Sequence, residues 1–308
     1  MNNLNPKNAP DDGIIILSDA TGLCGGTDAT QDTGAPKSIA STDMRLFNVT
    51  SELPFDSART RDRTITPLAY ISAFAAPAGD GTFLFLETAA SPRHEDTKRA
   101  WALVKENLFP ALTDLVRTYD LARRNGFHSK THGLPQDFGG RVDICYASGE
   151  RIAFSNNQTP IMTLKEGLAI YELFGLAMRG EQIPLPDTKK LQSIHFTENR
   201  ENGGYTDAVL SLTADGGILR KVKKYDTPDV YKTEATVATE TVNLIKKRVK
   251  DCGILAWSNL PSAEYKFGAK KTLTFVFADG KEITTTDNKK LPRQIDRDFF
   301  EIELELTK

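Results

Sequence analysis

A pattern of alternating apolar and polar residues occurs twice in the chain, once near its middle and once near its end. In segments 142–154 and 273–285, apolar residues occupy every second position before a Gly-containing turn and alternate again after it. With Gly149 aligned on Gly280, the matching apolar pairs are Val142 with Leu273, Ile144 with Phe275, Tyr146 with Phe277 and Ile152 with Ile283. Such alternation around a short turn is typical of a β-hairpin with one buried face. A repeated hairpin predicts two similar domains in tandem.

The residues around each hairpin predict the same order of elements in both halves. Apolar residues at three- and four-residue steps predict a helix from Trp101 to Tyr119 and another over 233–251. Three short apolar runs precede each helix, and a second helix follows each hairpin; the first of these begins at a capping box, Thr163-Leu-Lys-Glu166. Each half is therefore expected to be β-β-β-α-β-β-α, an α+β domain with a mostly antiparallel curved sheet packed on one main helix.

Length and composition set the expected domain boundaries. A chain of 308 residues is typical of two domains. Residues 1–40, rich in Gly, Asp, Thr, Asn and Pro, predict a flexible N-terminal arm, part of which can add an edge strand to the first domain. The two α+β repeats are expected at 41–180 and 191–308, with a Pro-containing linker at 181–190 between them.

The charge and cysteine content exclude several classes of partner. A formal net charge of −2, without a one-signed half, argues against nucleic acid or an anionic membrane as partner. No apolar run is long enough to span a membrane, and the N-terminus has no signal-peptide core. Three widely spaced cysteines, Cys24, Cys145 and Cys252, fit reduced thiols rather than a disulfide framework. We therefore expect a soluble, cytoplasmic protein.

Two histidines are the only candidates for a metal site. His128 and His132 are four residues apart, the spacing that places two imidazoles on one face of a helix, and Asp137 or Asp143 could supply a third ligand. They follow Gly126, however, so the alternative interpretation, which we favour, is a solvated loop that binds no metal. No phosphate-binding Gly motif and no G-x-S-x-G element occurs in the sequence. We expect no cofactor, and these patterns lean against an enzyme.

One aromatic residue stands apart from the predicted core. Trp257 lies beside Ser258 and Asn259, just past a predicted helix. It is a candidate surface anchor for a partner, and the alternative is that it caps the edge of the core.

Short sequence signatures accompany each predicted hairpin. The first half has Asn125-Gly126-Phe127, Ala147-Ser-Gly-Glu150 and Pro160; the second has Trp257-Ser-Asn-Leu260, Ala278-Asp-Gly-Lys281 and Pro292. In these features the chain resembles uncharacterised, tandemly duplicated α+β domains in Gram-positive bacterial proteins. The resemblance covers roughly half of the chain. It implies the fold and no activity.

These observations favour a non-enzymatic binding or interaction protein. Duplication doubles a surface and creates an interdomain groove, where we expect an unknown protein or small-molecule ligand to lodge. Two alternatives stay open. One is a metal-dependent hydrolase that uses the loop with His128 and His132, and the other is a structural component of an assembly, with exposed sheet edges as its contacts.

Overall fold

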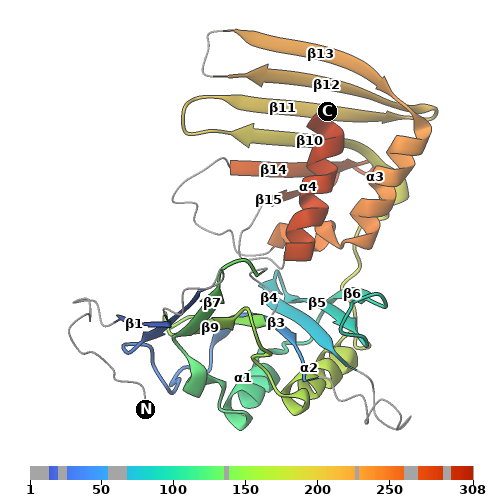
Figure 1. Cartoon of the computed structure of the whole chain (residues 1–308). Helices are drawn as coiled ribbons and strands as arrows, with labels where there is room; N and C mark the ends of the chain where they lie inside the picture. Colours follow the sequence, from blue (N-terminus) through green and yellow to red (C-terminus); the bar gives the residue numbers. More distant parts are fainter. Residues whose placement is uncertain are drawn as a thin grey trace, which may run out of the picture. The chain divides into compact units, whose positions relative to one another are not determined.

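A computed structural model describes residues 14–19, 26–54, 68–134, 139–225, 229–259, 270–286 and 293–307, with only the backbone given for 14–19, 257–259 and 293–296. Within these residues the protein is a mixed α+β structure with four α-helices and two sheets of mostly antiparallel strands (Figure 1). The chain divides into two compact units, the first made of residues 1–76 and 84–181 and the second of residues 77–83 and 182–308. No described helix combines the length and the apolar character that crossing a membrane requires.

The first unit contains a nine-stranded sheet in the order β1-β2-β7-β9-β8-β3-β4-β5-β6. Its strands are β1 (Ile14–Asp19), β2 (Thr27–Asp32), β3 (Met44–Glu52), β4 (Tyr70–Ala78), β5 (Gly81–Ala89), β6 (Lys98–Val104), β7 (Phe127–Thr131), β8 (Gly140–Tyr146) and β9 (Arg151–Asn156). β7 runs parallel to β9, whereas the pairs β2–β7, β8–β9, β3–β8 and β3–β4 are antiparallel.

Two helices, α1 (Phe109–Thr118) and α2 (Leu164–Ala177), cover one face of this sheet (Figure 1). The core lies between the helices and the strands, where the rings of Phe47 on β3 and Phe174 on α2 are 6.1 Å apart. The predicted capping box of α2 is confirmed, because the side chain of Thr163 accepts from the amide of Glu166 at 3.2 Å and the Glu166 carboxylate accepts from the amide of Thr163 at 2.7 Å.

The second unit contains a six-stranded sheet in the order β13-β12-β11-β10-β14-β15. Its strands are β10 (Leu191–Asn199), β11 (Tyr205–Thr213), β12 (Gly216–Lys224), β13 (Val230–Val237), β14 (Lys270–Phe277) and β15 (Glu282–Thr286). The helices α3 (Thr239–Asp251) and α4 (Arg293–Thr307) lie on one face of the sheet (Figure 1). Alternate strand residues such as Ile194, Phe196 and Phe275 are fully buried, as period-2 patterning requires.

Both predicted hairpins are present, but the predicted helix starts are wrong. Residues 98–104 form β6, and α1 begins only at Phe109, where the amide of Phe109 donates to Asn107 Oδ1 at 3.1 Å. Pro110 stands in the first turn, where a missing amide costs no helical hydrogen bond. Likewise, the expected helix over 233–251 is the end of β13 followed by α3. Four strands, not three, therefore precede α3 in the second unit, and four strands (β3 to β6) likewise lie between residue 41 and α1 in the first.

The segment assigned to a flexible N-terminal arm, 1–40, contributes two strands to the first sheet, β1 and β2. β2 pairs with β7 along five residues, from Thr27 opposite Thr131 to Gln31 opposite Phe127. The expected edge strand is therefore present, because strand pairing at a sheet edge satisfies backbone groups without needing a large apolar side-chain surface. Residues 1–13 and 20–25 lie outside the described part of the chain.

Candidate functional site

A hollow of about 580 Å³ lies on the first unit, where three segments that are distant in sequence meet. The first is the turn after β2, the second is the start of β7, and the third is the tip of the β8–β9 hairpin with the beginning of β9; β7 and β9 are neighbours in the sheet (Figure 1). The lining residues are Asp32, Gly34, Ala35, Pro36, Asn125, Gly126, His128, Ser148, Gly149, Glu150, Arg151 and Ala153. Its size is typical of pockets for small ligands.

The buried side chain of Asn125 ties the three segments together. Its Nδ2 donates to the carbonyls of Pro36 at 2.9 Å and Arg151 at 2.7 Å, and its Oδ1 accepts from the amide of Ala153 at 2.7 Å. With 3% of its surface exposed, Asn125 uses both of its amide hydrogens and one lone pair of Oδ1 in these contacts. The floor of the pocket is therefore fixed by one residue rather than by each segment separately.

Gly126 fits this site because its backbone and its neighbours leave no room for a side chain. Its φ is +80°, and a Cβ there would lie 2.7 Å from the Cβ of Ala35. Its amide donates to the carbonyl of Ala153 at 2.8 Å, which places the start of β7 against β9. The Asn-Gly pair thus sets the close approach of the turn after β2 to the sheet.

A bidentate ion pair fixes the one arginine of the pocket. Arg151 Nε lies 2.7 Å from Asp143 Oδ1, and its Nη2 lies 2.8 Å from Oδ2. Asp143 is buried, and Arg141 approaches the same carboxylate at 3.6 Å. The hydrogen bond to Asp143 raises the pKa of the Arg151 guanidinium. The guanidinium is therefore held in place while its side chain stays about half exposed, at 53%.

Both carboxylates at the pocket wall already serve the backbone. Glu150 accepts from the amides of Ala40 and Ser41, each at 2.9 Å, and from the hydroxyl of Ser148 at 2.9 Å. The hydrogen bond from the Ala40 amide is the largest of the interactions that lower the pKa of Glu150. Asp32 Oδ1 accepts from the amide of Gly34 at 2.8 Å, closing a turn. Both carboxylates therefore hold the backbone of the pocket wall in place.

His128 is the titratable group that faces the pocket from β7. Its Nδ1 lies 2.9 Å from Ser155 Oγ on the parallel neighbour β9. Desolvation by the surrounding protein lowers the pKa of His128, and the positive charges of Arg141 and Arg151 lower it further, against an opposite effect of Asp32. These effects favour the neutral imidazole, and no described residue hydrogen-bonds its Nε2.

The structure does not bring His128 and His132 together at one metal. The expected loop is wrong, because His128 lies within β7 and His132 follows its last residue. Four residues of strand separate them by about 13 Å, and His132 Nε2 lies 2.7 Å from Asp28 Oδ2, away from Ser155. Among the described residues no group of three His, Cys, Asp or Glu is arranged to hold a metal ion. Asp137 lies outside them.

Trp257 cannot be placed as a surface anchor. Its backbone belongs to a short 3-10 helix, η5 (Ile254–Asn259), which follows α3. Its side chain lies outside the described part of the chain.

Sequence reasoning missed most of this pocket. The Asn125-Gly126 pair carried a usable signal, because Asn-Gly marks a turn. The pairing of Arg151 with Asp143 carried none, since it depends on the register of β8 against β9, in which Asp143 faces Ala153. Neither a family model nor a curated protein matches the chain.

Proposed function

We propose that this is a non-enzymatic binding protein, built from two copies of one domain, and that the pocket of the first unit holds its ligand. The order of strands supports the duplication. Starting from the second strand of each hairpin, the first sheet contains the run β9-β8-β3-β4-β5-β6, and the second sheet runs β15-β14-β10-β11-β12-β13. Each strand holds the same place in chain order and in its sheet, and a helix follows β6 as α3 follows β13.

A shared irregularity supports it more strongly. β3 pairs with β8 through a register shift between Met44 and Leu46, and β10 pairs with β14 through a register shift between Leu191 and Ser193. In each unit the shift comes directly after the residue that pairs with the last residue of the hairpin's first strand, which is Tyr146 in β8 and Phe277 in β14. β-bulges persist within families because they set the bend of a strand. Two at equivalent positions are hard to reconcile with unrelated folds.

The hairpin tips agree bond by bond. In the first unit the amide of Tyr146 donates to the carbonyl of Glu150 at 3.0 Å, and that of Ala147 to Asp43 at 2.8 Å. In the second, the amide of Phe277 donates to Lys281 at 2.9 Å, and that of Ala278 to Lys190 at 2.8 Å. The cross-strand pairs Ile144–Ile152 and Phe275–Ile283 match as well. These are the alignments that the sequence pattern predicts.

Binding rather than catalysis follows from how the polar groups of the pocket are used. Glu150, Asp32 and Arg151 are each held by partners within the protein. The contact of His128 with Ser155 resembles part of a catalytic dyad, but no described residue hydrogen-bonds the second ring nitrogen, which a hydrolytic triad would need. Each charged group of the pocket lining already has a partner within the protein, so the ligand we propose is small, polar and uncharged.

The carrying observation is the single side chain of Asn125, which assembles three segments into a preformed hollow. Preformed sites bind without the cost of ordering the protein. The alternative function suggested by the sequence, a metal-dependent hydrolase, is not supported by the positions of His128 and His132 in the described part of the chain.

A fragment screen by two-dimensional NMR tests this function. We expect some uncharged polar fragments to shift the amide signals of Gly126 and His128. Ala153→Leu, which adds volume inside the pocket, should abolish these shifts, whereas Lys130→Leu, two residues farther along β7 than His128, should leave them unchanged. A screen with no hits at these amides, or shifts that persist equally in Ala153→Leu, would sink the proposal.

A further inference from the structure

The last strand of the second sheet, β13, has an open edge. It pairs with β12 without interruption from Lys224 opposite Val230 to Gly217 opposite Val237. Within the described part of the chain no strand pairs with its other side. Every residue from Val230 to Thr236 is exposed. A row of unpaired backbone donors and acceptors is therefore offered to solvent.

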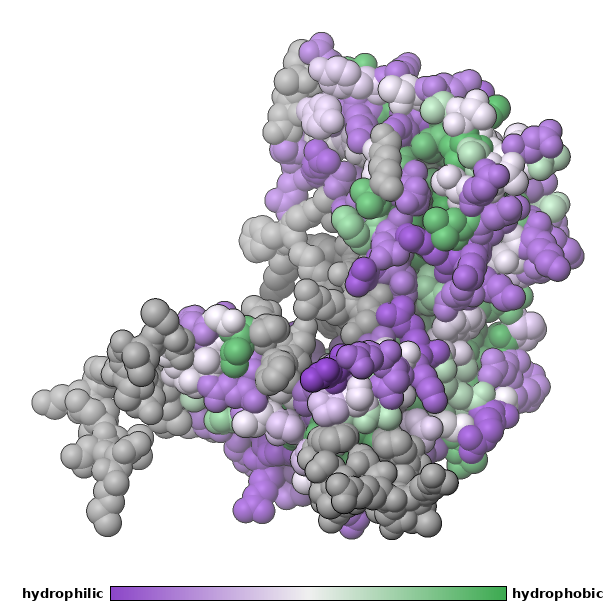
Figure 2. All heavy atoms as spheres, turned by 45° about the vertical axis from the view of Figure 1, so that its right-hand side comes forward, coloured by the Kyte–Doolittle hydropathy of each residue, from purple (hydrophilic) through white to green (hydrophobic). Residues whose placement is uncertain are grey.

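This edge lacks most of the usual protection against pairing with another chain. Natural edge strands are kept short or carry charged side chains, especially lysine, a proline, a bulge or an inward-pointing charge. β13 has eight residues, no proline and no shift in register against β12. It also exposes apolar surface, since Val230 is 44% and Tyr231 54% exposed. Figure 2 shows hydrophobic residues among the hydrophilic ones on the surface of the second unit. Lys232 is the one cation on the strand.

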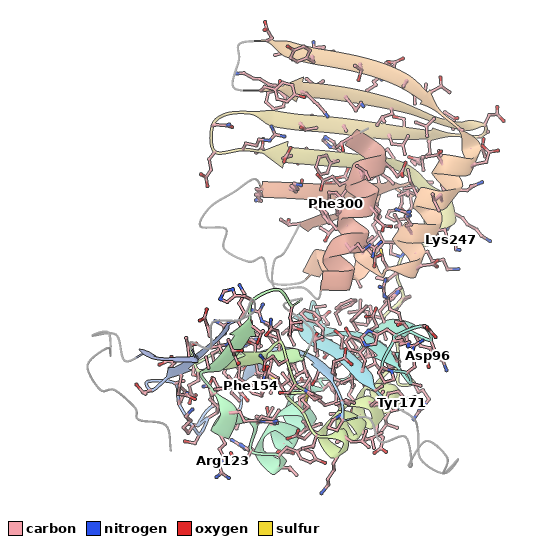
Figure 3. All side chains as sticks on the ribbon, in the orientation of Figure 1. Asp96, Arg123, Phe154, Tyr171, Lys247 and Phe300 are labelled. Carbon is pink, nitrogen blue, oxygen red and sulfur yellow. The ribbon has the colours of Figure 1, made fainter. Side chains whose placement is uncertain are left out.

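We propose that β13 pairs antiparallel with β13 of a second copy of this chain, about a two-fold axis at Thr233. The register against β12 places Thr233 opposite Lys221 and Tyr231 opposite Lys223, on one face, and Lys232 and Glu234 on the other. Side chains project from both faces of β13 (Figure 3). In the proposed register Lys232 of each copy lies directly opposite Glu234 of the other, and the two Thr233 residues face each other.

Charge selects this register from its neighbours. In an antiparallel pair the groups that face the partner alternate along each strand, so a two-fold axis passes through a pair of equivalent residues. An axis at Lys232 would place two lysines opposite each other, and an axis at Glu234 would place two glutamates opposite each other. Like charges directly opposite destabilise a strand pair, whereas opposite charges and Thr–Thr pairs stabilise it. The axis at Thr233 alone forms two Lys–Glu pairs.

The proposed pairing involves the second unit alone, so it does not depend on the pocket of the first unit. It is also compatible with an ion pair that β13 already makes. Glu234 already lies 2.7 Å from Arg220 on β12, on the same face. The carboxylate would therefore bridge Arg220 and the partner's Lys232, which lengthens a charge ladder rather than breaking one. An interface of one strand from each copy is smaller than that of most permanent dimers, so we expect a dimer that forms with increasing concentration.

Disulfide trapping tests the register. Residues directly opposite across an antiparallel pair have Cα atoms about 4.5–5.5 Å apart, which suits a disulfide. Thr233→Cys should therefore form a cross-linked dimer under mild oxidation. Lys232→Cys and Glu234→Cys, whose equivalent residues are offset by two positions, should cross-link far more slowly alone but readily when mixed together. The parent chain, which keeps its own cysteines, gives the background.

Sedimentation equilibrium tests the charge pairing. Lys232→Glu places carboxylates opposite Glu234 and should raise the dissociation constant about tenfold. Lys247→Glu makes the same charge change on the exposed surface of α3 and should leave it unchanged (Figure 3). The double variant Lys232→Glu/Glu234→Lys should recover part of the loss. A protein that stays monomeric at millimolar concentration, equal cross-linking at 232, 233 and 234, or a Lys232→Glu variant that dimerises like the parent would overturn the proposal.

Discussion

The amide of Asp32 donates to the carbonyl of Gly126 at 2.9 Å, and the two backbones are so close that a Cβ at Gly126 would lie 2.8 Å from the carbonyl oxygen of Asp32. This contact joins the end of β2 to the start of β7. It also joins two walls of the pocket. The approach depends on the absence of a side chain at one position, and that makes it open to a sharp test.

Gly126→Ala should destabilise the first unit by roughly 2–4 kcal/mol, because strain at positive φ adds to a steric clash with backbone that cannot move aside. Gly149→Ala is the matched control: its φ is +87°, and no atom lies within 4 Å of a Cβ there. It should cost only about 1–2 kcal/mol, from backbone strain alone. Urea denaturation of both variants measures the difference. Equal losses would mean that the close packing of Asp32 and Ala35 against Gly126 is not real.

Phe275→Ala should destabilise the second unit by roughly 3–5 kcal/mol, because it removes a fully buried aromatic side chain and leaves a cavity. Thr274→Ala changes the opposite face of β14, where the hydroxyl lies 2.9 Å from that of Thr284, and should cost less than about 1 kcal/mol. Denaturant melts followed by circular dichroism compare them. If the two variants lose the same stability, the assignment of buried and exposed faces in this hairpin is wrong.

His128 should make the stability of the first unit fall in mild acid. Desolvation and the charges of Arg141 and Arg151 hold its folded-state pKa below 6.5, so the unfolded chain takes up the proton first. The free energy of unfolding is then highest above pH 6.5 and declines as the pH falls through the window between 6.5 and the lower folded-state pKa. Urea melts at pH 7.5 and 5.5 should show a smaller decline for His128→Asn than for the parent. Identical declines would contradict the depressed pKa.

The sequence predicts features of the fold that depend on neighbouring residues. The β8–β9 and β14–β15 hairpins and the capping box of Thr163 and Glu166 each arise from local periodicity or spacing, and all are present. β6 was hidden because Trp101, Val104 and Leu108 match helical steps by coincidence, although a strand holds the first two. Alternation in a short edge strand is a weak signal when both faces are partly polar, as in β13.

The candidate site depends on contacts between segments far apart in the chain. Asn125 binds Pro36 across 89 positions, and no periodicity records such a contact. His128 was singled out for its spacing from His132, yet its place in the pocket comes from Ser155, which lies beside it across a parallel pair. The residue was therefore found for a reason unrelated to its position in the structure.

Because β2 forms part of the pocket wall, ligand binding in the pocket should change how readily a protease cleaves the N-terminal segment. Thr27 and Thr131, whose hydroxyls are 2.8 Å apart, are separated by 104 positions, so β2 joins the sheet only by closing a long loop. The buried core of the first unit begins at Met44, beyond β2. A ligand that touches both the turn after β2 and β7 binds only the closed form, and mass action then holds β2 in place. Protease cleavage before residue 40 would accordingly slow as the pocket fills, which gives a readout that needs no knowledge of the ligand's chemistry.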